Sequence, residues 1–491
     1  MKKFITFALI AAMMLTMLVA NVSAAAWDGT TSTAFTGEGT EASPYIIASA
    51  ENLKYLQEQV AAGTNYGGKF FEQTADIDLG NKEWTPIGTK DLAFRGIYDG
   101  KGYKVTGLYY KVASIFGGLF GAVKSTSEVS SAILNLTVEG KVDTWTDTTA
   151  DNANIAGLSG YTEGTAATPV IFANCVVDVD INVTVPSTLA DSKIMYIAGF
   201  AGFSSNVTVV NSVNKGDITV SSTGRHLFVG GFFGNAYNSA VLENVANSGN
   251  ISATVNSAHL AVVSGMIARS NGGAKIKNSA NYGAISSVGN ANAFVSGAIA
   301  QIFNMNTALG VTIENTANAG DLYAESKGEA TYGYAGGMVG YEAKGYTTVK
   351  NCVNKGTVTI ESIQANKNPG GIIGVSNFAQ KNSKFEDCVS TGRLVGWTNA
   401  TAEIVINCTA EAEVAVVDAA IKSIEDAQKA TTSVEINGKT YNFVVKTVAP
   451  ETTEPETTTP SNPNTGDVTS VIVLALVAVS VGAVLTIKKT K

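Results

Sequence analysis

The sequence predicts an all-β fold: a right-handed parallel β-helix of about seven to eight three-strand coils, with a small helical cap at each end. Three observations predict it, namely a repeat anchored on Asn, a glycine-rich element between the anchors, and three β-like runs in each repeat. Fifty glycines and 45% hydrophobic residues, with only 15% charged residues, suit a solenoid better than a disordered stalk. One repeat cannot bury its own apolar face, so the repeats are expected to stack.

Residues 25–64 are predicted to form an N-terminal cap that contains one helix. Ser49 can N-cap a helix that runs to about Ala62, and Gly63 follows as a terminator. The apolar face of this helix comprises Leu53, Leu56 and Val60. A cap is expected because the open end of a β-helix would expose unpaired strand edges and apolar core.

The repeat that organises residues 65–410 has one anchoring Asn per unit. From Asn211 to Asp387 the spacings are 33, 34, 37, 36 and 36 residues, and many units carry a second Asn three positions later. Rungs of a β-helix stack about 4.8 Å apart, so each recurring Asn is expected to form a ladder of side-chain amides at a turn. The anchor ladder comprises Asn135, Asn174, Asn211, Asn244, Asn278, Asn315 and Asn351. The second ladder comprises Asn214, Asn247, Asn281, Asn318 and Asn354.

The glycine-rich element recurs eight times between the anchors, for example as GGLFG from Gly117, GGFFG from Gly230 and GGIIG from Gly370. No Lys-Ser/Thr pair follows it, so a phosphate-binding loop is disfavoured. The glycines are expected where stacked backbones or tight turns exclude a Cβ atom. In the repeat anchored on Asn211, the three predicted β-runs are residues 217–221, 227–233 and 240–245.

Four cysteines support the same register because each directly follows an anchor position: Cys175, Cys352, Cys388 and Cys408. Other repeats have small or apolar residues in this slot, which favours buried free thiols over disulfides. A Cys352–Cys388 bridge between consecutive coils stays open as an alternative. No C-x-x-C pair or His partner accompanies them, which disfavours a metal centre.

A small C-terminal cap is predicted for residues 411–448. A helix is expected over residues 416–430, and Asn437-Gly438 predicts a type I′ hairpin turn. The inward positions of this helix are Ala419, Ile421, Ile424 and Ala427. Residues 449–461 are rich in Thr, Pro and Glu and predict an extended, wall-spanning linker.

Both ends of the chain carry targeting signals. Residues 1–24 predict a secretory signal peptide, with Lys2 and Lys3 before an apolar run and a small-residue cleavage site ending at Ala24. Residues 468–487 are uncharged and long enough to cross a bilayer, and lysines follow them. The net charge is −8, with 33 basic and 41 acidic residues and no basic cluster, which argues against nucleic acid as a partner.

The segment before the apolar span resembles the LPxTG sorting signal of Gram-positive wall proteins. Its residues are Asn462, Pro463, Asn464, Thr465 and Gly466. The resemblance implies that a sortase cleaves the Thr465–Gly466 bond and joins Thr465 covalently to peptidoglycan. It therefore implies a secreted protein at the cell surface, membrane-anchored until cleavage, with residues 462–491 as the sorting signal. Asn462 stands where Leu is usual, which leaves the sortase class open.

Residues 36–140 resemble proteins with GLUG-motif repeats. The matching residues are Trp84, Pro86, Gly88, Phe94, Gly96, Asp99, Gly100, Gly102, Gly107, Leu108, Gly118, Leu119, Phe120, Gly121 and Asn135. The resemblance implies a β-helix and a role at the bacterial surface. It transfers no activity, because the catalytic domain of immunoglobulin-cleaving metallopeptidases with such repeats has no counterpart here.

Candidate catalytic residues are sparse. His226 and His259 fall at similar places in adjacent repeats, which makes a metal or acid–base pair conceivable, although two polar residues at a strand entrance explain them as well. The acids Asp76, Asp78 and Asp99 are the weak candidates for a calcium site, and turn or cap roles compete with that interpretation. Asp178 and Asp180 complete the set of candidate acids. No cofactor-binding motif is present.

The sequence therefore predicts a non-enzymatic, wall-anchored β-helical protein that adheres to, or binds, a host or dietary glycan or protein. Three variable stretches are the expected contact sites: residues 145–153, 304–310 and 327–334. Two alternatives stay open. One is a β-helix polysaccharide lyase or glycosidase, which needs converging charged residues across several coils. The other is a plain structural spacer without a ligand.

Overall fold

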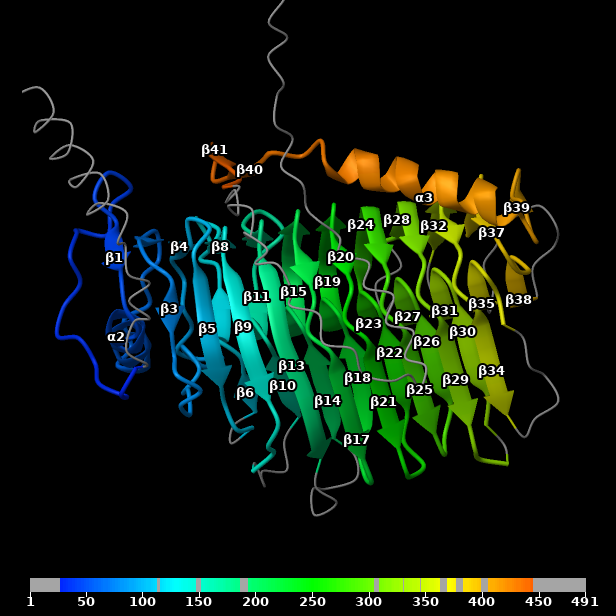
Figure 1. The fold of residues 1–491 in the computed structure, drawn as a ribbon, viewed down its shortest axis with the longest axis horizontal. Helices are drawn as coiled ribbons and strands as arrows, with labels where there is room; N and C mark the ends of the chain where they lie inside the picture. The colour runs from blue at the N-terminus through cyan, green and yellow to red at the C-terminus, as the bar shows by residue number, and fades with distance from the viewer. Residues whose placement is uncertain are drawn as a thin grey trace, which may run out of the picture. The chain divides into compact units, whose positions relative to one another are not determined.

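The computed structural model describes residues 27–112, 115–146, 152–185, 193–303, 309–329, 331–344, 346–362, 369–376, 383–398 and 405–444. The predicted signal peptide, linker and sorting signal lie outside these residues, as do parts of the predicted contact stretches. The described chain is a parallel β-solenoid of about seven coils with two short helices, which confirms the predicted fold class (Figure 1).

Each full coil has four β-segments rather than three. In one coil they are β17 (Ile218–Ser222), β18 (His226–Gly230), β19 (Phe233–Glu243) and β20 (Ala246–Asn247). The predicted run 227–233 is split at Gly231 because the chain turns there, and a Cβ atom on Gly231 would lie 2.2 Å from the Gly265 carbonyl oxygen. The predicted run 240–245 is the second half of the long strand β19, which bends around a corner of the coil.

Equivalent segments of successive coils pair in parallel and form four strand columns. The first column is the seven-stranded sheet of β6 (Phe116–Gly117), β10 (Ala153–Ala156), β14 (Ile194–Ala198), β18, β22 (Ala261–Ser264), β26 (Ala293–Ser296) and β30 (Gly333–Gly336). The second column comprises β7 (Phe120–Lys124), β11 (Ser159–Glu163), the first halves of β15 (Ala201–Val210) and β19, β23 (Ile267–Ser270), β27 (Ile299–Phe303), β31 (Val339–Lys344), β35 (Ile373–Ser376) and β38 (Val395–Thr398).

The other two columns complete the coils on either side of the anchoring Asn. The third comprises β1 (Tyr45–Ile47), β2 (Phe70–Gln73), β4 (Ile97–Asp99), β8 (Ala132–Leu134), β12 (Val170–Ala173), the second halves of β15 and β19, the first parts of β24 (Gly273–Asn281) and β28 (Val311–Asn318), β32 (Thr347–Lys350), β36 (Lys384–Glu386) and β39 (Val405–Ile406). The fourth comprises β3 (Ile77–Asp78), β5 (Lys104–Tyr109), β9 (Thr137–Val142), β13 (Val176–Val185), β16 (Val213–Asn214), β17, β20, β21 (Ile251–Val255), the last residues of β24 and β28, β25 (Ile285–Gly289), β29 (Leu322–Ser326), β33 (Val353–Asn354), β34 (Val358–Ser362) and β37 (Val389–Ser390).

The anchoring Asn turns the chain between the third and fourth columns. All of these anchors have a positive φ, between 47° and 55°, a left-handed conformation that Asn tolerates better than other residues with a side chain. Their amides bond along part of the stack: Asn174 Nδ2 donates to Asn135 Oδ1 at 2.9 Å, and Asn211 Nδ2 donates to Asn174 Oδ1 at 2.9 Å. The ladder is not continuous, because Asn244 Nδ2 donates to Thr431 Oγ1 instead of to a neighbouring Asn.

The second Asn of each repeat forms a buried, continuous ladder, as expected. Each Nδ2 donates to the next Oδ1 from Asn214 to Asn354, at 2.7–2.8 Å, and also to a glycine carbonyl two residues later. This inner ladder packs directly against the glycine-rich element. A Cβ atom on Gly265 would lie 2.3 Å from Asn281 Oδ1, and one on Gly297 would lie 2.5 Å from Asn318 Oδ1. The two repeat signals in the sequence therefore describe one packing contact.

The N-terminal helix α2 (Ala50–Ala61) covers the first coil with the predicted face. Leu53, Leu56 and Val60 are buried, and Gly63 follows the helix with a φ of 99°. Ser49 occupies the N-cap position, but its side chain makes no capping hydrogen bond to the helix.

The C-terminal segment does not close the last coil as a cap. Its helix α3 (Val414–Gln428) lies lengthwise across several coils, and the hairpin of β40 (Ser433–Ile436) and β41 (Lys439–Asn442) reaches coils near the N-terminus (Figure 1). The helix buries Val417, Ile421 and Ile424, whereas Ala419 is exposed and was wrongly expected to face inward. Asn437 and Gly438 both have positive φ, as a type I′ turn requires.

Candidate functional site

The three acids considered for calcium bond to turns of the solenoid. Asp78 Oδ1 accepts from the Gly80 amide at 2.8 Å, and Asp76 Oδ1 accepts from the Lys104 amide at 2.9 Å. Asp99 Oδ1 accepts from Asn135 Nδ2 at 2.9 Å, which continues the anchor ladder by one coil. Within the described ranges, no three His, Cys, Asp or Glu side chains are grouped so that they could hold a metal ion.

Asp178 and Asp180 lie on β13, and Asp178 is in register with Glu139 of the neighbouring strand β9. Asp180 Oδ1 accepts from the Asp217 amide at 2.9 Å, so it orders the turn of the next coil. Burial raises the pKa of Asp178. Side chains at i and i+2 of a strand share a face, and here that face is the outer one.

The two histidines are neighbours on adjacent coils. Their rings meet edge to face with centroids 4.7 Å apart, and His226 Nδ1 accepts from the Leu260 amide at 2.9 Å. Burial, followed by the positive charges of His259 and Arg269, lowers the pKa of His226 to about 4. His226 is therefore neutral at neutral pH. The described residues offer no third group that would make the pair a metal site.

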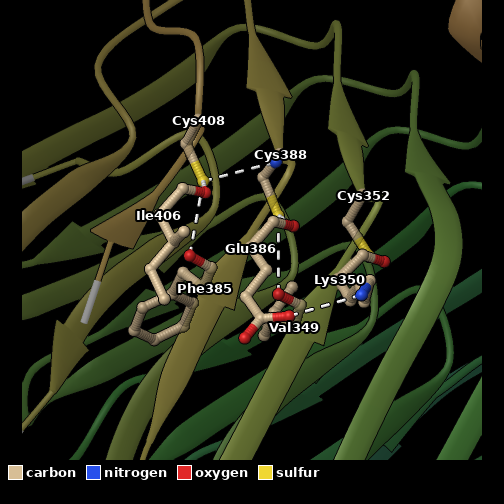
Figure 2. A network of polar contacts seen from close by, with 8 residues as sticks. All are labelled: Val349, Lys350, Cys352, Phe385, Glu386, Cys388, Ile406 and Cys408. Carbon is tan, nitrogen blue, oxygen red and sulfur yellow. Dashed lines mark hydrogen bonds and ion pairs between the residues drawn. The ribbon is translucent and has the colours of Figure 1, made fainter. Parts of the chain in front are cut away.

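The cysteines occupy the same slot of the repeat, and three of the four are buried there. Figure 2 shows Cys352, Cys388 and Cys408 at the same position of three neighbouring coils, and all four cysteines are free thiols. The Cys388 thiol donates to the Val349 carbonyl at 3.6 Å, and Cys408 Sγ accepts from the Cys388 amide at 3.3 Å. Burial raises the pKa of Cys175 to about 12, so this thiol is unreactive in the folded state.

A second group of large side chains lies outside the core, where the first and second strand columns meet. In β18, Leu227 and Val229 point into the core, so Phe228 between them points outward, yet only 1% of its surface is exposed. It is covered because outward side chains of the two columns pack against one another. We call this row the outer aromatic seam: Phe116, Tyr161, Tyr196, Phe203, Phe228, Phe294, Tyr334 and Tyr341.

Ring contacts connect the seam across the two columns and along them. Tyr161 and Phe203 stack with centroids 5.0 Å apart and planes 5° from parallel, and Tyr196 contacts Phe203 at 6.1 Å. At the other end, Tyr341 lies 4.8 Å from Tyr334 and 5.7 Å from Phe294. The seam thus follows the coils over most of the described solenoid.

Arg269 interrupts the aromatic row in the second column. Its guanidinium lies over the rings of Phe228, at 5.2 Å, and Phe303, at 4.8 Å. Arg269 is in register with Gln301 of the next coil, which is only 7% exposed. Neither Arg269 Nε nor Gln301 Oε1 has a hydrogen-bond partner among the described residues. The seam therefore contains a guanidinium nitrogen and an amide oxygen without a hydrogen-bond partner among the described residues.

Sequence reasoning identified one part of this surface and missed the rest. The predicted contact stretch 327–334 contributes Tyr334, with Tyr332 beside it at 6.2 Å and 38% exposed. The other two stretches lie largely outside the described residues. A signal for the seam exists: an aromatic residue stands two positions before the Gly or Ser of the glycine-rich element at Phe228, Phe294 and Tyr334. Flanking apolar residues hide this alternation.

A cavity of about 300 Å³ lies beneath α3 at the anchor ladder. Its solenoid side comprises Asn315, Asn351, Val353, Asp387 and Val389, and its helix side comprises Ala420, Ser423, Ile424 and Ala427. The small side chains of the helix account for the space. No charged group other than Asp387 lines it, so the seam is the stronger candidate for a binding surface.

No family model matches the chain. A segment of 109 residues is 32% identical to a "Putative Gly-rich membrane protein" of Evansella cellulosilytica, and the match covers 21% of this chain and 13% of that protein. The crystal structure of a "putative immunoglobulin A1 protease" from Bacteroides ovatus aligns over 84% of this chain and 95% of its own, with 14% identity and a TM-score of 0.36. Neither described helix is long and apolar enough to span a membrane.

Proposed function

We propose that this protein is a cell-wall-anchored surface protein of a Gram-positive bacterium, whose β-solenoid binds a glycan or protein ligand without catalysing a reaction. The observation that carries the proposal is the outer aromatic seam with Arg269 in it. Aromatic side chains with a few convergent polar groups are typical of ligand-binding surfaces. The solenoid does not need the seam to close its core, because the seam packs as clusters of its own.

A ligand-free spacer accounts poorly for Arg269. Removing a guanidinium from water without an anionic partner costs free energy, and burial lowers the pKa of Arg269 accordingly. A spacer would gain nothing from burying this cation. A binding protein would gain affinity, because the cation makes a strong contact with a ligand that carries an anionic group.

The non-enzymatic part of the proposal is supported by the described carboxylates. Asp76, Asp78, Asp99 and Asp180 accept hydrogen bonds from backbone amides or from Asn135. Glu342 is buried and accepts from the hydroxyls of Ser376, at 2.7 Å, and Ser383, at 2.9 Å. These roles are structural, whereas a lyase or glycosidase needs acids that face a substrate.

A glycan array tests ligand binding directly. The probe is the purified chain of residues 25–461, which lacks the predicted signal peptide and sorting signal. We expect specific signals that an Arg269→Met variant reduces. An array without any signal, together with no binding to extracellular-matrix proteins, would favour the spacer.

Wall anchoring is tested separately in a Gram-positive host that expresses the full chain. Mass analysis of wall digests is expected to find a C-terminus at Thr465 linked to a peptidoglycan peptide. A Thr465→Ala variant should lose this linkage and stay in the membrane fraction. Recovery of the unmodified chain with its C-terminal lysines in the membrane fraction would contradict the proposal.

A further inference from the structure

We propose that Arg269 and the seam residues around it form a site for a carboxylate-bearing saccharide, with Arg269 as the residue that recognises the carboxylate. The inference rests on the proposed binding function and specifies its ligand class. It is carried by three observations: an unpaired cation, unused amide oxygens beside it, and a surface whose backbone is already fully paired.

The first observation is that Arg269 lacks an anion. Arg269 Nε has no hydrogen-bond partner among the described residues, and the guanidinium contacts the rings of Phe228 and Phe303. Most described lysines behave differently, since Lys104, Lys124 and others contact carboxylates. In a protein with a net charge of −8, an intramolecular partner could easily be present. Its absence beside Arg269 points to an anion from outside.

The two aromatic rings next to Arg269 hold its guanidinium in an orientation that suits a planar anion. Phe228 and Phe303 lie on it at 5.2 and 4.8 Å and restrict its orientation. A guanidinium held in one plane offers two parallel N–H groups to a carboxylate, a geometry that a lysine cannot supply. Part of the Arg269 side chain is exposed, so a ligand can reach it.

The second observation concerns the neighbouring amides. Gln301 Oε1 has no hydrogen-bond partner although Gln301 is 7% exposed. Asn271 is two residues from Arg269, and its Nδ2 donates to Asn235 Oδ1 at 2.8 Å while its Oδ1 has no partner. Both oxygens are acceptors that need a donor. Both oxygens are buried in this structure, so a saccharide hydroxyl donates to them only after the side chains that cover them move aside.

The third observation separates a saccharide from an acidic peptide. An extended peptide commonly binds by adding a strand to a free sheet edge. The strand of Arg269, β23, is paired on both sides, with β19 and with β27, so no edge is free at this site. Recognition must then use side chains alone. Aromatic rings, amides and one arginine are the groups that suit a polar ring bearing a carboxylate.

The test measures binding of matched acidic and neutral sugars by calorimetry. The probes are oligogalacturonate and its methyl ester, and sialyllactose and lactose, so that a uronic acid and a sialic acid are compared, each with a neutral counterpart. The full chain without its signal peptide is used. We expect one acidic probe to bind at least about 10-fold more tightly than its neutral counterpart, in line with a charge-assisted contact. Arg269→Met should abolish that difference.

A matched control is Arg393→Met, since Arg393 Nη2 already donates to the Gly396 carbonyl at 2.9 Å. It should keep the preference for the acidic probe, and thermal melts should show that both variants fold. Equal binding of acidic and neutral sugars, unaffected by Arg269→Met, would overturn the inference and leave the binding function intact. Preference for a glutamate-rich peptide would overturn the saccharide assignment. No binding of any probe would overturn both proposals.

Discussion

Two outer corners of the same coils differ in what covers them. The corner at the anchoring Asn is covered by the chain itself, through α3 and the hairpin. The clusters of the outer aromatic seam include no residue of α2, α3, β40 or β41. Both corners have apolar side chains outside the core, and the seam also has a partly buried cation, Arg269, that lies over aromatic rings. The comparison suggests that one corner serves stability and the other serves recognition.

The helix α3 can cover the Asn corner because its apolar residues recur at about the distance that separates stacked coils. Val417, Ile421 and Ile424 are four and three residues apart, which is about 6 and 4.5 Å along a helix. Coils stack about 4.8 Å apart. The helix therefore presents about one apolar residue to each coil. Polar contacts also join successive parts of the helix to successive coils. Asp418 pairs with Lys355, and Glu425, further along the helix, accepts from Tyr282, which lies two coils closer to the N-terminus than Lys355.

The largest expected effect comes from uncovering the Asn corner. Replacing both Ile421 and Ile424 by Ala removes two buried side chains, 8% and 5% exposed, and should weaken docking of α3 by about 4 kcal/mol. Hydrogen exchange of residues 414–428 should then become fast while the strands of the solenoid stay protected. Ala419→Ser, on the exposed side, is the control. Unchanged protection of the helix in the double variant would show that its apolar contacts do not hold it.

A second change tests the contact between the glycine-rich element and the inner Asn ladder. Gly265→Ala places a methyl group 2.3 Å from Asn281 Oδ1 and 2.6 Å from the Gly297 carbonyl oxygen. The inner ladder cannot yield without losing hydrogen bonds, so we expect a loss of about 3 kcal/mol in the free energy of unfolding. Gly392→Ala meets no atom within 4 Å and should be close to neutral in the same denaturant titration. Equal stabilities of the two variants would contradict the contact between glycine element and ladder.

The sequence predicted the parts of this fold that repeat. The period, the inward slot of the cysteines, the inner Asn ladder and both helices follow from residue patterns that recur or alternate. The path of the C-terminal segment does not, because Ile421 and Ile424 indicate only that α3 has an apolar face. What that face covers depends on contacts with residues such as Tyr282, more than a hundred positions away. The seam was missed for a related reason, since Phe228 stands within a continuous apolar run.

A smaller effect is expected from one polar contact of the covered corner. The Tyr282 hydroxyl donates to Glu425 Oε1 at 2.9 Å in a partly buried position, so Tyr282→Phe should weaken docking of α3 by about 1 kcal/mol. Hydrogen exchange of the helix again measures it. Tyr237→Phe, at a residue that is 46% exposed, should leave that exchange unchanged. A shift of similar size in both variants would show that the effect does not come from the hydrogen bond between Tyr282 and Glu425.

The last predicted effect is on the pH dependence of stability, which reports on the positive charge of Arg269 near His226. The pKa of His226 is lowered to about 4 by burial and then by the positive charges of His259 and Arg269, against about 6.5 in an unfolded chain. The folded state therefore binds fewer protons between these values. This contribution to stability is present above pH 6.5 and is lost as the pH falls toward 4. His226 is only half-buried, so solvent screening limits the loss to about 1 kcal/mol.

His226→Gln should remove this part of the pH dependence, so melting temperatures of the variant should fall less between pH 6.5 and 4 than those of the native chain. At pH 7 His226 is neutral whether the chain is folded or unfolded. The difference in melting temperature between the variant and the native chain at pH 7 therefore serves as the reference. Equal slopes in both proteins would contradict the assignment. A carboxylate bound to Arg269 should offset part of the repulsion and raise the pKa of His226. Repeating the titration with an acidic sugar present therefore connects the pH response of the seam to its proposed ligand.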